Sequence, residues 1–390
     1  MSLKFSPINF SLFEFTRRVY LAGRISLKGL LLLPLYYLQI IPMVPFAWLQ
    51  HLLYRRRIRM TSISKDPIFI LGHYRSGTTL LQKLLVSDKR FGYLTYYDSL
   101  FPNSNLLFGE KMKRIFQWLI DRVKIKNPFF HDRILQLSEP DEEDDYLMNK
   151  ASVYSAYWGL IFPKCWRQWL NGEPQFSNQH YSSGWKKEYL KTIKYITFKN
   201  KGKQLVLKNP PNTERIHLLL ELFPSAKFIF IHRNPYHLYY SIRNMWKRAI
   251  INYYSVQKIS DDELDELIFN HFDYLIDRYK KEKHLIPAGN LIEISYEELT
   301  TKPFETIRKI YTTIGLDDFE LAVTSLKQQL EKEKEYRNFQ YQFDDTTLKK
   351  IEKHWKKYID RWNYRPPPTY QERNSSFNDP ETARYNIRAR

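Results

Sequence analysis

One short segment constrains this 390-residue chain more than any other: Gly-His-Tyr-Arg-Ser-Gly-Thr-Thr at residues 72–79. Its spacing is that of the phosphate-binding loop G-x-x-x-x-G-K-[ST], in which backbone N–H groups and a helix N-terminus surround an anion. The apolar run 67–71 before it predicts a buried strand, and the leucine-rich run 78–85 after it predicts a helix. Together these elements predict a site for a phosphate-like anion. Taken alone, the two glycines would equally suit an ordinary tight turn between strand and helix.

The loop lacks the lysine that nucleotide triphosphatases carry. Thr78 occupies that position, which argues against phosphoryl transfer from ATP or GTP. A kinase would also need magnesium and a catalytic aspartate near the loop, and the sequence supports neither. Arg75 offers a planar guanidinium instead, which suits two oxygens of a phosphate or sulfonate. The predicted anion is therefore not the γ-phosphate of ATP.

A second phosphate site is predicted further along the chain. The apolar run 227–231 predicts another strand, and Arg233 follows it almost directly. Pro235 suits the first turn of a helix that we expect to run to residue 248, with Ser241 on it. Arg233 and Ser241 are eight residues apart, so a strand end and a helix face can reach one phosphate. Two such sites on parallel strands predict a nucleotide with phosphates at two positions of its ribose.

These segments resemble the two nucleotide-binding motifs of the PAPS-dependent sulfotransferases, whose donor is 3′-phosphoadenosine 5′-phosphosulfate (PAPS). Residues 72–79 resemble their 5′-phosphosulfate loop, and Arg233 with Ser241 resembles their 3′-phosphate motif. Further stretches resemble family segments in the same order: 205–210, 223–227 and 295–299. The likeness is to the broad bacterial-type branch with the Gly-x-x-Arg-Ser-Gly-Thr-Thr loop. The chain lacks the Arg-Lys-Gly adenine loop of the cytosolic animal enzymes, which leaves the adenine contacts unassigned.

The resemblance implies a metal-free PAPS-dependent O-sulfotransferase. It also implies that Lys208, at the end of a strand that begins near residue 204, stabilises the negative charge on the leaving group. The residues that would bind the donor are Arg75, Ser76, Gly77, Thr78, Thr79, Arg233 and Ser241. A non-catalytic nucleotide- or anion-binding member of the fold is the alternative, although the key basic residues are intact.

An acidic run at residues 139–145 is the expected source of the general base. It holds six carboxylates, whose mutual repulsion raises the pKa of one of them toward neutrality. By resemblance this run lies in the acceptor pocket, and the candidates are Glu142 and Glu143, between which the local register does not choose. A solvated charge cluster at a helix start is the alternative. Three histidines are rival bases, of which the first is nearest the loop: His73, His217 and His232.

The segment 91–200 is rich in Tyr, Trp and Phe. It predicts an apolar or sugar-stacking acceptor pocket, or else an aromatic cap without a ligand. The preferred acceptor is a hydroxyl of a membrane-associated lipid, quinone or glycolipid. A soluble carbohydrate or small metabolite is the alternative.

The N-terminal region contains 22 uncharged residues, 29–50, with basic residues on both sides. This length is enough to span a bilayer, but Pro34, Pro42 and Pro45 would interrupt a helix. The symmetric flanking charge favours helices that lie in the membrane interface, or a re-entrant hairpin. A core helix over the sheet and a true span are the alternatives. The net charge of +19 would attract anionic lipid, so we expect a cytoplasmic protein, peripheral at the inner face of the membrane.

Composition and element order set the fold and the compartment. Cys165 is the only cysteine, which excludes an intrachain disulfide and suits a bacterial cytosol. No nucleic-acid-binding signature accompanies the basic charge, so nucleic acid is not an expected partner. The expected strands alternate with helices and lie near residues 67–71, 204–208, 227–231 and 291–294. This order predicts a P-loop-type, mainly parallel α/β sheet flanked by helices, after an N-terminal apolar helical segment. The predicted divisions are 1–65 (apolar and basic, helical), 66–365 (catalytic) and 366–390 (polar tail).

Overall fold

A five-stranded parallel sheet lies at the centre of the computed structural model. The structure describes residues 25–150, 152–172, 176–334 and 341–368, and a few positions between 16 and 23. The strand order is β2-β5-β1-β6-β7. The strands are β1 (Ile68–Leu71), β2 (Phe91–Gly92), β5 (Gln204–Lys208), β6 (Lys227–His232) and β7 (Leu291–Ser295). A separate antiparallel pair consists of β3 (Lys126–Asn127) and β4 (Phe130–Ile134).

Helices cover both faces of the sheet, which explains why its central strands are apolar throughout. On one face Ile68 and Ile70 of β1 pack in the same cluster as residues of three helices: α4 (Thr78–Leu85), α16 (Pro303–Thr313) and α17 (Phe319–Lys334). On the other face Phe69 and Leu71 join a larger cluster with α11 (Gln179–Lys199), α12 (Ile216–Leu222) and α14 (Asp261–Glu282). The core of the molecule therefore consists of two layers, one on each side of β1.

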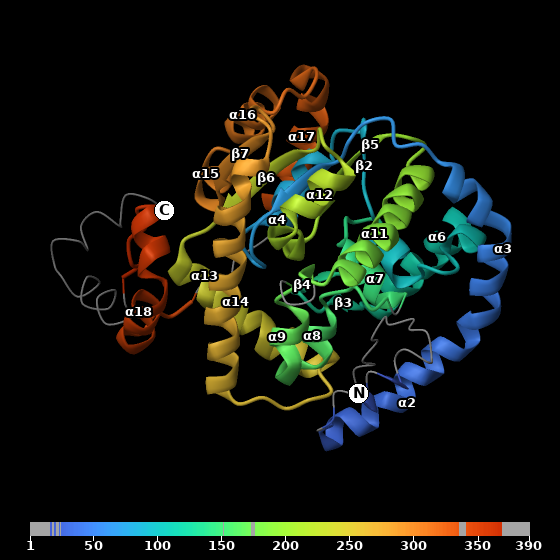
Figure 1. The fold of residues 1–390 in the computed structure, drawn as a ribbon, viewed down its shortest axis with the longest axis horizontal. Helices are drawn as coiled ribbons and strands as arrows, with labels where there is room; N and C mark the ends of the chain where they lie inside the picture. The colour runs from blue at the N-terminus through green and yellow to red at the C-terminus, as the bar shows by residue number, and fades with distance from the viewer. Residues whose placement is uncertain are drawn as a thin grey trace.

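The remaining described helices connect and surround these layers (Figure 1). They are α2 (Leu27–Ile40), α3 (Val44–Met60), α5 (Tyr96–Leu100), α6 (Asn105–Val123), α7 (Glu143–Asn149), α8 (Trp158–Ile161), α9 (Trp166–Trp169), α13 (Pro235–Met245), α15 (Tyr296–Thr301) and α18 (Asp345–Arg361). Shorter 3-10 segments are η1 (Ile41–Met43), η2 (Pro163–Cys165), η3 (Pro210–Glu214) and η5 (Lys283–Leu285). After α13 the chain continues as a π-helix, η4 (Trp246–Tyr254).

The predicted fold class is confirmed. The four expected strands are present with ends shifted by at most one residue, and the helix expected at 78–85 has those bounds. The helix expected to reach residue 248 instead changes to π geometry after Met245. The strand β2 was not predicted, because two residues are too few for a periodic pattern.

The N-terminal segment forms two helices along one edge of the molecule, on the side opposite α18 in Figure 1. Pro34 lies inside α2, so the expected interruption there is wrong, whereas Pro42 lies in η1 and Pro45 in the first turn of α3. Within the described ranges, no helix combines the length and the apolar character needed to cross a membrane.

Candidate functional site

The 72–77 loop joins β1 to α4 and requires glycine at two positions. Gly72 and Gly77 have φ of 142° and 102°. A Cβ at Gly72 would lie 2.5 Å from the carbonyl oxygen of Ile231, and one at Gly77 would overlap the ring of Tyr296. Arg75 has a φ of 69°, a left-handed conformation that is uncommon for a residue with a side chain. The loop thus packs closely against Ile231, near the end of β6, and against Tyr296, directly after β7. An ordinary turn between a strand and a helix does not need such close contacts.

The predicted donor-binding residues Arg75, Arg233 and Ser241 lie together. Arg75 Nε donates to Ser241 Oγ at 3.1 Å, and Arg233 Nη1 donates to the Arg75 carbonyl oxygen at 3.0 Å. The Arg233 guanidinium lies over the ring of Tyr296, 4.3 Å from its centroid. Burial lowers the pKa of Arg233, and its Nε has no hydrogen-bond partner among the residues described. A buried cationic donor without a partner at this position fits an anionic ligand.

The other predicted donor residues lie at the start of α4. Gly77 is the N-cap of α4, and Thr78 and Thr79 begin the helix and line a cavity. Ser76 differs from these two, because its hydroxyl donates to the His73 carbonyl oxygen at 2.8 Å within the loop. The backbone N–H of Ser76 donates to the same His73 carbonyl oxygen at 3.2 Å. Both donors of Ser76 are therefore already used within the loop, and a ligand would have to compete with these hydrogen bonds.

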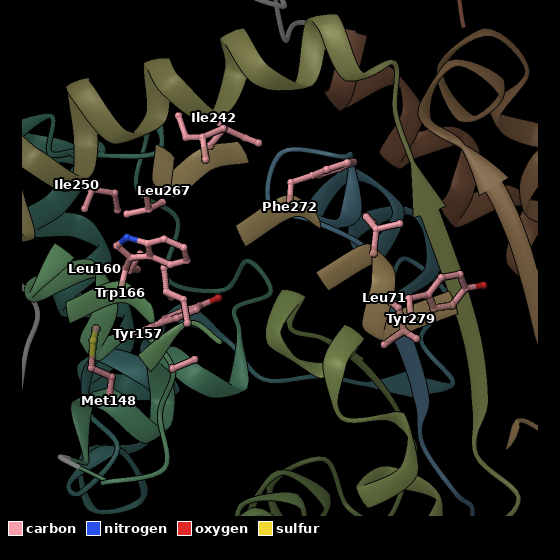
Figure 2. Close-up of a cluster of buried hydrophobic side chains, with 14 of the residues drawn as sticks. Leu71, Met148, Tyr157, Leu160, Trp166, Ile242, Ile250, Leu267, Phe272 and Tyr279 are labelled. Atoms are coloured by element: carbon pink, nitrogen blue, oxygen red, sulfur yellow. The ribbon is translucent and has the colours of Figure 1, made fainter. Parts of the chain in front are cut away.

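The cavity that the start of α4 lines has a volume of about 710 Å³. Arg75, Arg233 and Tyr296 contact one another on its wall, and we name this part the loop end. Lys208 and Glu142 also line the cavity. The apolar part of the lining, which we name the apolar arm, consists of Tyr157, Leu160, Leu170, Ile242, Met245, Trp246, Ile250, Leu267 and Ile268. Figure 2 shows Tyr157, Leu160, Ile242, Ile250 and Leu267 of this arm as neighbours in the core.

Lys208 and Glu142 form an ion pair on the cavity wall. Lys208 is the last residue of β5 and is almost wholly buried, and Glu142 is the N-cap of α7. Burial raises the pKa of Glu142, and the charge and hydrogen bond of Lys208 oppose that rise without cancelling it. A partly buried carboxylate with a raised pKa beside a buried ammonium is suited to proton transfer next to a developing negative charge.

Glu143, the other candidate base, is fully buried and does not line the cavity. Its Oε2 accepts from Asn212 Nδ2 at 3.4 Å and from the Tyr189 hydroxyl at 3.5 Å. Burial raises the pKa of Glu143 to about 8. Asp144 is buried as well and is paired with Arg215 at 2.8 Å. The alternative of a solvated charge cluster is therefore wrong, and Glu142 is the member of the two candidates that faces the cavity.

Two further carboxylates of the acidic run line the cavity and were not singled out from the sequence: Asp141 and Asp145. Burial raises the pKa of Asp141 to about 6 and raises that of Asp145 well above its ordinary value. The acidic run itself was the signal that could have found them. Leu80, Thr300, Lys327 and Leu330 also line the cavity, and no motif in the sequence indicates them.

The three histidines occupy different places. His73 lines the cavity, is buried, and has its pKa lowered by that burial to about 4. His217 lies on α12, where its Nδ1 is 2.9 Å from a carboxylate oxygen of Glu282. His232 Nδ1 is 2.8 Å from the Tyr364 hydroxyl, and neither His217 nor His232 lines the cavity. His73 is thus the histidine among the rival bases that the fold brings to the site.

Comparisons with known proteins agree with this geometry. The family model described as "Sulfotransferase family" matches residues 67–320. An omega-hydroxy-beta-dihydromenaquinone-9 sulfotransferase, from Mycobacterium tuberculosis and from Mycobacterium bovis, is 31% identical over 318 residues, which are 81% of this chain and 79% of that protein.

Solved structures show the same fold. The sulfotransferase STF9 from Mycobacterium avium superposes with a TM-score of 0.65 at 16% identity, over 92% of this chain and 97% of that chain. The sulfotransferase STF1 from Mycobacterium tuberculosis gives a TM-score of 0.59 at 18% identity, over 72% of this chain and 75% of that chain. The match over most of the chain confirms the resemblance that the motifs indicated: this chain belongs to the sulfotransferase family.

Proposed function

We propose that the protein transfers a sulfuryl group from PAPS to a hydroxyl of an apolar, membrane-associated acceptor such as a lipid, quinone or glycolipid. The observation that supports this most is the single cavity that connects three regions: the 72–77 loop with Arg233, the Lys208–Glu142 pair, and the apolar arm. The name of the 31% identical relative specifies a hydroxylated menaquinone as its acceptor, which supports an acceptor of this class.

The donor would lie at the loop end. Arg75 and the first turn of α4, with Gly77, Thr78 and Thr79, would hold the 5′-phosphosulfate, because backbone N–H groups at a helix start favour anions. Arg233 and Ser241 would hold the 3′-phosphate. Both contact Arg75, so the two phosphate sites are joined through one guanidinium-bearing residue.

The reaction would be an in-line displacement at sulfur. The acceptor oxygen forms a bond to sulfur while the bond between sulfur and the bridging oxygen of the 5′-phosphate breaks, and the nucleotide bisphosphate leaves. Glu142 accepts the proton of the acceptor hydroxyl, and the Lys208 ammonium stabilises the negative charge on the leaving oxygen. The raised pKa of Glu142 makes it a stronger base than an ordinary carboxylate. His73, Asp141 and Asp145 are the remaining candidate bases on the cavity wall, and Glu143 would need a rearrangement to reach it.

The apolar arm favours a lipid over a soluble carbohydrate. A sugar placed against Leu160, Ile242 and Leu267 would lose hydrogen bonds to water without replacing them, which is unfavourable. An alkyl or isoprenoid chain would instead gain roughly 25 cal/mol for each Å² of apolar surface removed from water. The soluble carbohydrate or small metabolite therefore ranks second, and a non-catalytic role third.

Helices α3 and α6 present an apolar surface that suits membrane attachment. One stripe of α3, with a residue at every fourth position, contacts the body of the protein. The Phe46 ring packs against Phe108, and Gln50 Nε2 donates to the Pro102 carbonyl oxygen. The Tyr54 hydroxyl donates to the Leu106 carbonyl oxygen. Most of the remaining side chains of α3 are exposed, whereas Ala47 and Ile58 are partly buried. Apart from Phe46, the exposed large apolar residues of α3 and α6 are Val44, Trp48, Leu49, Leu52, Leu53, Met60, Ile115, Trp118, Leu119 and Val123. We name this set the apolar surface.

Basic side chains accompany the apolar surface. Arg55, Arg56, Arg57 and Arg59 are exposed on α3, which contains no acidic residue, and Arg122 lies over the ring of Trp118 on α6. This combination suits the interface of an anionic membrane, with apolar rings in the acyl region and guanidinium groups at the headgroups. A peripheral position at the inner face of the membrane would give the apolar arm access to lipid acceptors.

Calorimetric titration without magnesium tests the donor assignment. The protein should bind adenosine 3′,5′-bisphosphate at least about tenfold more tightly than AMP, because only the bisphosphate uses Arg233 and Ser241. Arg233→Ala should abolish that preference, and Arg308→Ala, which changes an arginine paired with Glu320 on the surface, should keep it. Equal binding of both nucleotides by the unmodified protein would contradict the proposal.

A further inference from the structure

Four aromatic side chains meet on the cavity wall where the apolar arm begins: His73, Tyr74, Tyr157 and His271. We name them the ring cluster. The His73 ring centroid is 5.4 Å from that of Tyr74 and 5.3 Å from that of His271. The Tyr74 centroid is 5.8 Å from that of His271 and 6.0 Å from that of Tyr157. The loop after β1, the start of α8 and the middle of α14 thus contribute to one local group of rings.

Each ring of the cluster has a buried polar atom without a hydrogen-bond partner in the part of the chain that the structure describes. These atoms are His73 Nε2, the Tyr74 hydroxyl, the Tyr157 hydroxyl and His271 Nε2. An unsatisfied buried polar group costs about 1–3 kcal/mol, so such atoms are rare. Four of them on one wall of a cavity indicate a binding site for a polar group inside that cavity.

The hydrogen bonds of the two imidazoles fix what this polar group must offer. His73 Nδ1 is 3.0 Å from the Tyr74 carbonyl oxygen, which can only accept, so Nδ1 bears the proton and Nε2 bears a lone pair. His271 Nδ1 is 3.1 Å from Asn171 Oδ1, which leads to the same tautomer. Burial lowers the pKa of His73 to about 4 and that of His271 well below its ordinary value, so both rings stay neutral near neutral pH.

The ring cluster therefore offers two nitrogen acceptors beside two phenol hydroxyls. A carbonyl or ether oxygen could accept from the phenols but could not donate to either nitrogen. A hydroxyl can do both, because it donates one hydrogen bond and accepts others. The site selects for a hydroxyl group of the ligand.

The cluster adjoins the reaction centre. Tyr74 and His73 directly precede Arg75 in the loop, and Tyr74 is close enough to Glu142 that the carboxylate charge, after burial, helps to raise the pKa of the phenol. We propose that the ring cluster binds a second hydroxyl of the acceptor, adjacent to the hydroxyl that receives the sulfuryl group, and so selects an apolar diol over an apolar mono-alcohol. This inference rests on the proposed function, since it assumes that the apolar arm binds the acceptor.

Equilibrium binding of a matched pair of ligands tests this selectivity. The protein is first saturated with adenosine 3′,5′-bisphosphate, and 1-decanol and 1,2-decanediol are then titrated separately. We expect the diol to bind about tenfold more tightly, the factor that one to two additional hydrogen bonds would give. Tyr157→Phe and His271→Phe should each reduce that preference to about threefold or less, because each removes a polar atom but keeps a ring.

Two control variants separate this role from a structural one. Tyr146→Phe removes the hydroxyl of a buried tyrosine that does not line the cavity, and it should keep the full preference for the diol. Leu267→Ala, in the apolar arm, should weaken both alcohols by the same factor and leave their ratio unchanged. Only the ring-cluster variants should change the ratio.

The outcomes are distinguishable. Equal binding of the two alcohols to the bisphosphate-loaded protein, or failure of both to bind it, overturns the ring-cluster proposal while the donor site stands. A preference that survives in both ring-cluster variants also overturns it. Failure of the bisphosphate itself to bind would contradict the proposed function, and the ring-cluster proposal with it.

Discussion

At the scale of single residues, the ion pair between Lys208 and Glu142 lies on the cavity wall, where the proposed function has donor and acceptor meet. We expect Lys208→Ala to lower the rate of sulfuryl transfer by roughly 100- to 1000-fold, the range for loss of one group that stabilises transition-state charge. Affinity for adenosine 3′,5′-bisphosphate should change by no more than about threefold, because Arg75 and Arg233 remain. Lys186→Ala, which removes a surface partner of Glu221, is the matched control and should leave both quantities unchanged.

A pH dependence of stability is expected from Glu143, because burial raises its pKa from 4.5 to about 8. The folded state then binds this proton more tightly than the unfolded state does. The stabilisation is fully present below about pH 4.5 and is lost as pH rises through about 8, with a slope of at most about 1.4 kcal/mol per pH unit. Urea unfolding at several pH values should show that Glu143→Gln flattens this decline, whereas an unchanged slope would refute the assignment.

At the residue scale, a motif with fixed spacing was enough to predict which side chains lie together, whereas the ligand that they share stays a prediction. Arg75, Arg233 and Ser241 were expected to share one ligand, and they contact one another in the structure. The choice between Glu142 and Glu143 needed the structure, because adjacent residues point in different directions at the start of α7. His271 could not be found from the sequence, because its neighbours from the 72–77 loop are about 200 residues away along the chain.

At the scale of elements, the turn between β1 and α4 depends on Gly77, whose Cβ position is occupied by the Tyr296 ring and whose φ is 102°. Gly77→Ala should destabilise the protein by about 2 kcal/mol or more and weaken bisphosphate binding at least about tenfold. Gly289→Ala also has a positive φ but has open space around it, so it should cost about 1 kcal/mol and leave binding intact. Urea unfolding and calorimetry of the two variants measure both effects, and equal losses of binding would contradict the account.

The elements that could be predicted are those with an unbroken local pattern. Short apolar runs predicted four strands to within one residue at each end: β1, β5, β6 and β7. The motifs lie at the ends of these strands. The π-helix after Met245 could not be predicted, because its side chains, among them Trp246 and Ile250, face the cavity through tertiary packing that no periodicity expresses. The predicted division of the chain at residues 65 and 365 stays a prediction.

At the scale of the whole molecule, the apolar surface on α3 and α6 predicts binding to anionic vesicles. Trp48 and Trp118 are 75% and 57% exposed, so Trp48→Glu and Trp118→Glu should each lower the bound fraction without changing the free energy of unfolding by more than about 0.5 kcal/mol. Leu321→Glu changes an equally exposed leucine on α17 and should have no effect on the bound fraction. Co-sedimentation with vesicles containing phosphatidylglycerol measures this, and equal effects of all three variants would refute a defined membrane surface.

Salt provides an independent check on the same surface. The arginines of α3 should make binding stronger to anionic than to zwitterionic vesicles, and raising the ionic strength should weaken it. Apolar contacts alone would give binding that does not depend on salt or on lipid charge. The net charge of +19 is spread over the whole chain, so the salt effect alone does not identify α3. The double variant Arg55→Glu with Arg59→Glu should weaken binding to anionic vesicles if the arginines of α3 are responsible.

The measurement that tests the central claim most directly is transfer of radiolabelled sulfate from PAPS to an ω-hydroxylated quinone presented in vesicles. We predict a labelled lipid product that forms in equal amount with adenosine 3′,5′-bisphosphate, and that Lys208→Ala suppresses. Label transfer only to soluble sugars would contradict the lipid acceptor. Absence of transfer to any hydroxyl, from a protein that binds the bisphosphate tightly, would contradict catalysis itself.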